Sequence, residues 1–125
     1  TTARRRQNDE NVIEIVQRIQ EDLQTPVMAD CHIFEDAIRT SADIVAPTLS
    51  LNDESDEYTP DFAFIEALIQ KQPKPVIAEG RFWDPENVSR AFAMGVHAIV
   101  IGSAVTRPWL ITERYVRASR KYQQL

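Results

Sequence analysis

The sequence has 125 residues, a length within the usual range for one domain. Its 43% hydrophobic and 26% charged residues are typical of a globular protein. The net charge of −5 argues against a nucleic-acid partner, and no apolar run approaches the roughly 20 residues of a membrane span. The single cysteine excludes an internal disulfide and favours the cytoplasm. Because the chain opens on Thr1 without an initiator Met, we expect a fragment.

The first half of the chain predicts two helices and two strands. Residues 8–23 carry apolar side chains at helical spacing, with Asn8 or Asp9 as the N-cap. Residues 26–30 and 43–46 are short apolar runs that predict strands. Between them we expect a short helix with three inward side chains, Phe34, Ala37 and Ile38.

The second half continues the alternation of helix and strand. Asp61 is expected to cap a helix, Asp84 and Pro85 to begin another, and Gly95 to end it. The predicted elements are, in order, an acidic loop over 49–60, a helix bearing Phe64, Ile65, Leu68 and Ile69, a strand over 75–78, the helix ending at Gly95, a strand over 97–101, and a helix from Pro108 bearing Ile111, Tyr115 and Val116.

This order indicates an α/β fold with parallel strands. The strands are continuous apolar runs, which is typical of parallel strands covered on both faces. A complete (β/α)8 barrel takes about 250 residues, so four strand–helix units amount to about half of one. Two architectures stay open: a half-barrel whose other half lies in another segment or chain, and an open, doubly wound sheet.

Polar residues follow each predicted strand, at the edge where parallel β/α folds place their sites. They are Asp30 after the first strand, Thr48 and Ser50 after the second, Glu79 and Arg81 after the third, and Ser103 after the fourth. Gly80 and Gly102 directly follow the last two strands. Since glycine lets backbone N–H groups approach an oxyanion, we predict a phosphate site at Gly80–Arg81 and Gly102–Ser103. The alternative is that both glycines only make tight turns.

Two acids on this edge are candidates for chemistry. Glu79 ends a very apolar strand, where a carboxylate is costly to bury unless it is paired or useful. A catalytic or hydroxyl-binding role is favoured over an ion pair with Arg81. For Asp30, binding of substrate and capping of the next helix stay equally open.

Several other residues suit structural roles. Cys31 is expected to be a small core residue, since it and His32 point to opposite faces. His97 opens its strand at the structural end of the sheet. Trp83 and Trp109 closely follow the two glycine loops and are expected to pack against the protein, with a wall of the site as the alternative.

Three motifs resemble the N-acetylmannosamine-6-phosphate 2-epimerase family. They are Val-Met-Ala-Asp at 27–30, Val-Ile-Ala-Glu-Gly-Arg at 76–81, and Val-Ile-Gly-Ser-Ala-Val-Thr-Arg-Pro at 100–108 with Ile-Thr at 111–112. Residues 2–6 are similar to that family's loop after strand four, and residues 44–50 resemble its sixth strand. The match runs in order along essentially the whole chain.

The resemblance implies a TIM-type (β/α)8 barrel of which residues 1–125 are the C-terminal half, with no second domain. The chain would supply strands five to eight and the preceding helix. The implied activity interconverts N-acetylmannosamine 6-phosphate and N-acetylglucosamine 6-phosphate in sialic acid catabolism, without cofactor or metal. The family precedent favours a homodimer.

The resemblance also implies roles for individual residues. Glu79 resembles the family's essential glutamate, and Arg107 resembles an arginine that holds the substrate. Asp30, Thr48 and Ser50 are further candidates for substrate binding. The family's catalytic lysine lies on an earlier strand, so this chain needs the N-terminal half of the barrel.

One departure from the family leaves alternatives open. The acidic stretch over 51–57 separates the strand-six motif from Tyr58 and would repel an anionic sugar, which puts sugar contacts from that loop in doubt. The alternatives are another sugar-phosphate isomerase or synthase with a barrel fold, and a non-catalytic half-barrel that dimerises.

Overall fold

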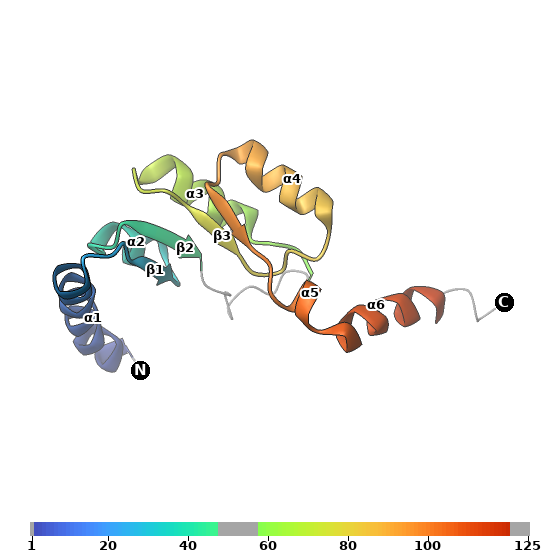
Figure 1. The fold of residues 1–125 in the computed structure, drawn as a ribbon, viewed down its shortest axis with the longest axis horizontal. Helices are drawn as coiled ribbons and strands as arrows, with labels where there is room; N and C mark the ends of the chain where they lie inside the picture. Colours follow the sequence, from blue (N-terminus) through green and yellow to red (C-terminus); the bar gives the residue numbers. More distant parts are fainter. Residues whose placement is uncertain (1, 48–57, 121–125) are drawn as a thin grey trace.

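The computed structural model describes residues 2–47 and 58–120, with side chains from residue 13 onward. Helices and strands alternate as the sequence predicts, and each strand lies within two residues of its expected bounds (Figure 1). The elements are α1 (Thr2–Leu23), β1 (Met28–Cys31), α2 (Phe34–Arg39), β2 (Ile44–Pro47), α3 (Phe62–Lys71), β3 (Ile77–Glu79), α4 (Pro85–Met94), β4 (Ala98–Val100), α5 (Ser103–Thr106) and α6 (Pro108–Arg120).

The strands are all parallel and lie in the order of the chain. β1 pairs with β2, and β3 pairs with β4. A bridge between Val45 and Val76 joins the two pairs, with the Val45 N–H donating to the Pro75 carbonyl oxygen at 3.1 Å. A doubly wound sheet reverses its strand order at a switch point, whereas barrel strands follow in sequence. The order found here is therefore that of an arc of a barrel.

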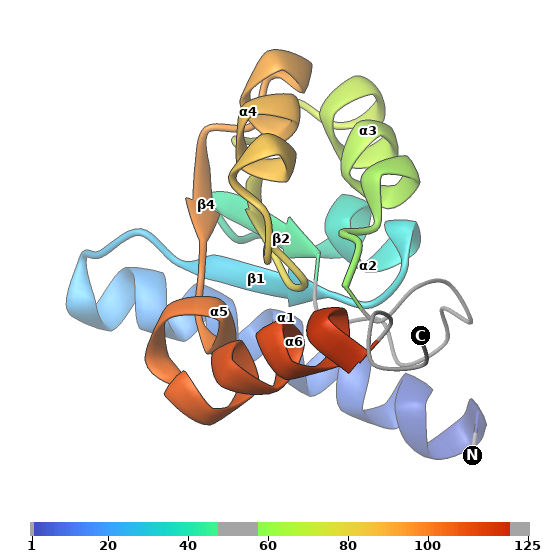
Figure 2. The same ribbon diagram turned by 90° about the vertical axis from the view of Figure 1, so that its right-hand side faces the viewer.

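The convex face of this arc carries the hydrophobic core. Helices α2, α3 and α4 lie side by side over it (Figures 1 and 2). The core side chains come alternately from the strands and from the inner stripes of these helices, and include Val45, Ile65, Leu68, Ala78 and Ala91. Burial of this apolar surface is the main stabilising contribution.

Two predicted helix boundaries of this layer are confirmed. The Asp61 carboxylate accepts from the Phe64 N–H at 2.9 Å and so caps α3. Gly95 ends α4 in the left-handed region at φ 104°. Asp84 precedes α4 and Pro85 begins it as expected, although the Asp84 side chain makes no capping hydrogen bond there.

Apart from Asp30 and Glu79, the concave face is apolar, and it is half-exposed. The parallel register places Met28 beside Ile44 and Ile77 beside Ala98 on this face. Met28 is 41% exposed and Val100 is 45% exposed, so the residues that the structure describes leave this face partly uncovered. In a complete barrel these positions point into a packed interior.

Two sequence expectations for helices are wrong. α1 begins at Thr2 rather than near Asn8, because residues 2–7 contain good helix formers and no Gly or Pro. The arginines at 4–6 therefore lie within a helix and not in a strand–helix loop. In α2 only Ala37 is fully buried, and Ile38 lies on the flank of this six-residue helix, 57% exposed.

The C-terminal helix α6 extends away from the sheet (Figure 1). None of its residues is buried, and Tyr115 is 75% exposed. Trp109 is 65% exposed, so its predicted packing role is wrong for this chain. Within the described ranges, none of the helices has the length and apolarity needed to cross a bilayer.

Candidate active site

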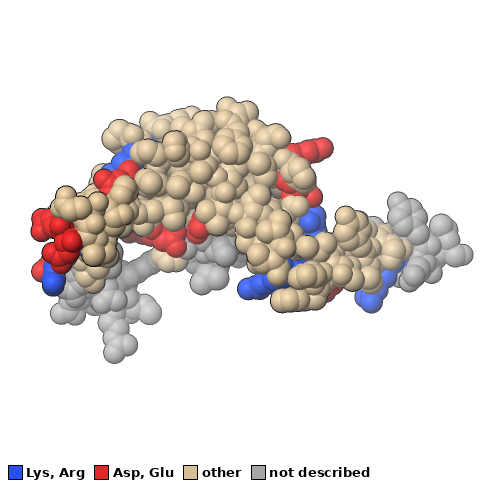
Figure 3. Space-filling model, viewed as in Figure 1, with Lys and Arg blue, Asp and Glu red and all other residues tan. Residues whose placement is uncertain are grey.

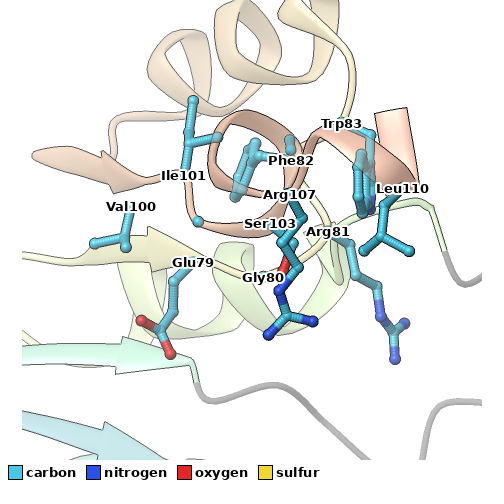
Figure 4. Close-up of a pocket in the computed structure, with 12 residues that line it drawn as sticks. Glu79, Gly80, Arg81, Phe82, Trp83, Val100, Ile101, Ser103, Arg107 and Leu110 are labelled. Atoms are coloured by element: carbon cyan, nitrogen blue, oxygen red, sulfur yellow. The ribbon is translucent and has the colours of Figure 1, made fainter. Parts of the chain in front are cut away.

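A cavity of about 420 Å³ opens at the C-terminal ends of β3 and β4 (Figure 4). Residues 79–83, residues 100–104, Arg107 and Leu110 line it. Its volume falls within the range of small-molecule pockets, roughly 300–1,000 Å³. The fold thus gathers six of the predicted site residues around one cavity: Glu79, Gly80, Arg81, Gly102, Ser103 and Arg107.

The two glycines serve the pocket in different ways. Gly80 has φ 87° and Arg81 has φ 61°, so the chain turns sharply through the left-handed region as it leaves β3. Glycine is favoured at position 80 for that reason. Gly102 has φ −98°, and a Cβ atom built there would meet nothing within 4 Å. Its small size therefore leaves open space at the mouth of the pocket, where an anion has access to the backbone.

Positive charge surrounds the mouth of the pocket. Arg81 and Arg107 both line it, and Figure 4 shows their guanidinium groups extending to the same side. Arg107 is exposed, and its side chain makes no hydrogen bond or ion pair with the residues that the structure describes. The helix α6 carries three more arginines, and Figure 3 shows basic side chains (blue) along it. This arrangement suits the binding of an anionic group such as a phosphate.

The two candidate acids lie together on the concave face. Asp30 pairs in register with Ala46 of β2, and β2 lies between β1 and β3. Ala46 lies level with Ile77 of β3, so Glu79 lies two residues further along that strand, and its carboxyl hydrogen-bonds with Asp30 across β2. Burial, then the charge of Asp30 and a hydrogen bond with Asp30, raise the pKa of the Glu79 carboxyl. In Figure 4 the Arg81 guanidinium points away from Glu79.

Asp30 does not cap α2. The Asp36 carboxylate occupies that place instead, accepting from the His32 N–H at 3.1 Å and from the Ile33 N–H at 3.3 Å. An acid inside the first turn can satisfy the N-terminal amides of a helix as well as one before it. The capping alternative for Asp30 is therefore wrong, and its carboxyl instead hydrogen-bonds with that of Glu79.

Comparison with known proteins decides the family. A family model described as "Putative N-acetylmannosamine-6-phosphate epimerase" matches residues 1–121. The chain belongs to this family.

Similar proteins from bacteria agree with this assignment. A "Putative N-acetylmannosamine-6-phosphate 2-epimerase" of Clostridioides difficile is 40% identical over 94% of this chain and 54% of its own length. One from Caldanaerobacter subterraneus is 40% identical over 82% of this chain and 46% of its own. The solved N-acetylmannosamine-6-phosphate 2-epimerase from Clostridium perfringens superposes with a TM-score of 0.77 at 32% identity, covering 86% of this chain and 48% of that one. The chain thus spans about half the length of these epimerases and has half of their TIM-barrel fold.

Sequence reasoning missed one group of residues behind the pocket. Arg114 of α6 donates to the Trp83 carbonyl oxygen at 3.3 Å and forms an ion pair with Asp84 at 3.0 Å. The ring of Trp83 lines the pocket and meets the ring of Tyr58 edge-on, with centroids 5.8 Å apart. No local pattern signals these contacts, since the residues come from separate segments and meet only in the tertiary fold.

The remaining candidates fall outside the pocket. Thr48 and Ser50 lie outside the described residues, as does the acidic stretch over 51–57. Cys31 is 1% exposed, and burial with the charges of Asp36 and Asp30 raises the pKa of its thiol to about 11, so its core role is confirmed. His97 lies at the opposite end of the sheet, where its N–H donates to the Val76 carbonyl oxygen.

Proposed function

We propose that residues 1–125 form the C-terminal half of a single (β/α)8 barrel, and that the whole protein is an N-acetylmannosamine-6-phosphate 2-epimerase of amino-sugar catabolism. The observation that carries this proposal is the single pocket where Glu79 meets two glycine loops and two arginines. Membership of the epimerase family supports the same activity.

The residues of the pocket suit this chemistry. Inversion at C2 removes a proton α to the open-chain aldehyde and returns it to the other face, which needs an acid, a base and a stabiliser for the enolate oxygen. Glu79 is the proton-transfer group, and the raised pKa of its carboxyl suits that task. Arg81, Gly80, Gly102 and Ser103 hold the phosphate, and Arg107 and Asp30 hold the sugar.

The other catalytic group is proposed to come from outside this chain. The family resemblance implies a lysine on an earlier strand, in the N-terminal half of the barrel. The half-exposed concave face around Met28 and Val100 is the surface which that half would cover. A homodimer and a cytoplasmic location complete the proposal, the latter supported by the buried free thiol of Cys31.

Substitution of Glu79 tests the proposal. In the full-length protein, Glu79→Gln is expected to lower kcat by about 10²–10⁴-fold, because a general acid–base group is lost. Inhibition by inorganic phosphate should stay unchanged, since the phosphate loops are intact. Glu66→Gln is the matched control, because Glu66 is an exposed carboxylate on α3. A Glu79→Gln enzyme that turns over the sugar phosphate as fast as the control would overturn the role of Glu79.

A further inference from the structure

The two loops that line the pocket come from different β/α units. Residues 79–83 follow β3, and residues 100–104 follow β4 and lead through Arg107 into α6. The pairing of β3 with β4 fixes where the two loops begin, since Glu79 lies opposite Val100. None of the residues in α6 is buried, so the core does not fix how this helix lies against the β3 loop.

Among the described residues, the Arg114 guanidinium connects α6 to the β3 loop. Leu110, on the first turn of α6, faces the pocket, and Arg114 lies one turn further along the same side of the helix. From there Arg114 reaches two successive residues of the β3 loop, the Trp83 carbonyl at 3.3 Å and the Asp84 carboxylate at 3.0 Å. It also lies over two aromatic rings, with its central carbon 5.2 Å from the Trp83 centroid and 5.6 Å from that of Tyr58.

We infer that Arg114 is a positioning residue that clamps the β3 loop to α6 and thereby sets the width of the phosphate site, with Trp83 as its wall. This inference rests on the proposed function for the identity of the substrate, but not for the binding of an anion. Arginine suits the task because its planar fork binds carbonyl and carboxylate together while it stacks on an aromatic ring. A lysine has a single point of attachment and cannot make all of these contacts.

The test measures binding of inorganic phosphate to the full-length protein. Binding is followed by the change in tryptophan fluorescence. Trp109 is exposed and lies outside the pocket, so Trp109→Phe leaves Trp83 as the tryptophan of this chain whose fluorescence reports on the site. In that background Arg114→Gln and Arg114→Lys are each expected to weaken phosphate binding by on the order of tenfold. KM for the sugar phosphate should rise in parallel while kcat stays within about twofold, because Arg114 does not touch the reacting atoms. A merely structural role would not separate KM from kcat in this way.

Two further variants keep the inference falsifiable. Arg120→Gln removes the same charge from the end of α6, and the Arg120 side chain has no hydrogen-bond or ion-pair partner among the described residues. It should leave phosphate binding unchanged. Asp84→Asn removes only the ion pair of Arg114 and leaves its hydrogen bond to the Trp83 carbonyl. This variant tests the role of Arg114 if Arg114→Gln does not fold. Its expected effect is a smaller loss of phosphate affinity in the same direction.

Three results would overturn the inference. They are unchanged phosphate affinity in both Arg114→Lys and Asp84→Asn, an equal loss in Arg120→Gln, and a fall in kcat with KM unchanged. Phosphate binding is measured without turnover. A protein whose phosphate affinity depends on Arg114 but that does not epimerise the sugar would therefore refute the proposed function and leave the inference about Arg114 intact.

Discussion

At the scale of single residues, the notable pair is Asp30 and Glu79. They come from β1 and β3, and their carboxyls meet across β2. Because the pKa of Glu79 is raised in the folded protein, the protonated carboxyl contributes to the free energy of unfolding. This stabilisation is present at low pH and is lost as the pH rises through the raised pKa, where Glu79 ionises. A destabilising arrangement of this kind is typical of functional sites.

Removal of the charge on Asp30 should move the titration of Glu79. Because the charge of Asp30 and its hydrogen bond both raise the pKa of Glu79, Asp30→Asn is expected to lower that pKa. The shift should be partial, since burial is the largest cause and stays in place. The pH profile of kcat/KM for the full-length protein measures it, and the limb that belongs to Glu79 should move to lower pH. A limb that stays in place or moves to higher pH would show that the two carboxyls do not interact.

At the scale of elements, short helices and strands are held by side chains from distant segments. α2 has six residues, and the Lys74 ammonium donates hydrogen bonds to two carbonyl oxygens at its C-terminal end. The acceptors are the Ala37 oxygen at 3.2 Å and the Thr40 oxygen at 2.6 Å. Directly before β2, the Asp43 carboxylate accepts from the Val27 N–H at 2.9 Å and from the Gln20 amide at 2.8 Å. These contacts lower the pKa of Asp43 and tie α1, β1 and β2 together.

The cap on α2 is open to a direct test. Lys74→Met keeps the length of the side chain but removes the donor from two carbonyl groups. We expect the free energy of unfolding to fall by about 2 kcal/mol, because hydrogen bonds from a charged group are lost at a half-buried site. Urea denaturation measures the change. Lys71→Met is the control, since the Lys71 ammonium only lies over the Phe34 ring at 5.6 Å on an exposed helix face. Equal effects of the two substitutions would rule out the capping role.

At the scale of the whole molecule, the alternation of elements could be predicted because each depends on local residues. The Asp61 cap and the Gly95 terminus are examples, since each acts on its own neighbours in sequence. The edge that holds the site could also be predicted, because parallel strands end on one side of a sheet. The start of α1 was misjudged because an apolar pattern marks only the part of a helix that packs, while residues 2–7 are helical by propensity.

Tertiary contacts between distant segments could not be predicted. Arg114 meets Trp83 across 31 positions, and Lys74 meets Ala37 across 37. The short helix α5 was missed for a different reason, since its residues 103–106 are too few to carry a periodic pattern. The exposure of Trp109 and Ile38 also depends on which surfaces the rest of the fold covers. Residue type alone predicts burial for both.

The central claim is that Glu79 takes part in proton transfer at C2 of an acetamido sugar phosphate. The most direct measurement follows deuterium from solvent into C2 when the full-length protein is incubated with N-acetylmannosamine 6-phosphate in D₂O. Deuterium is expected at C2 together with the epimerised sugar, and Glu79→Gln is expected to abolish both. A full-length protein that binds the sugar phosphate but incorporates no deuterium would rule out this role of Glu79.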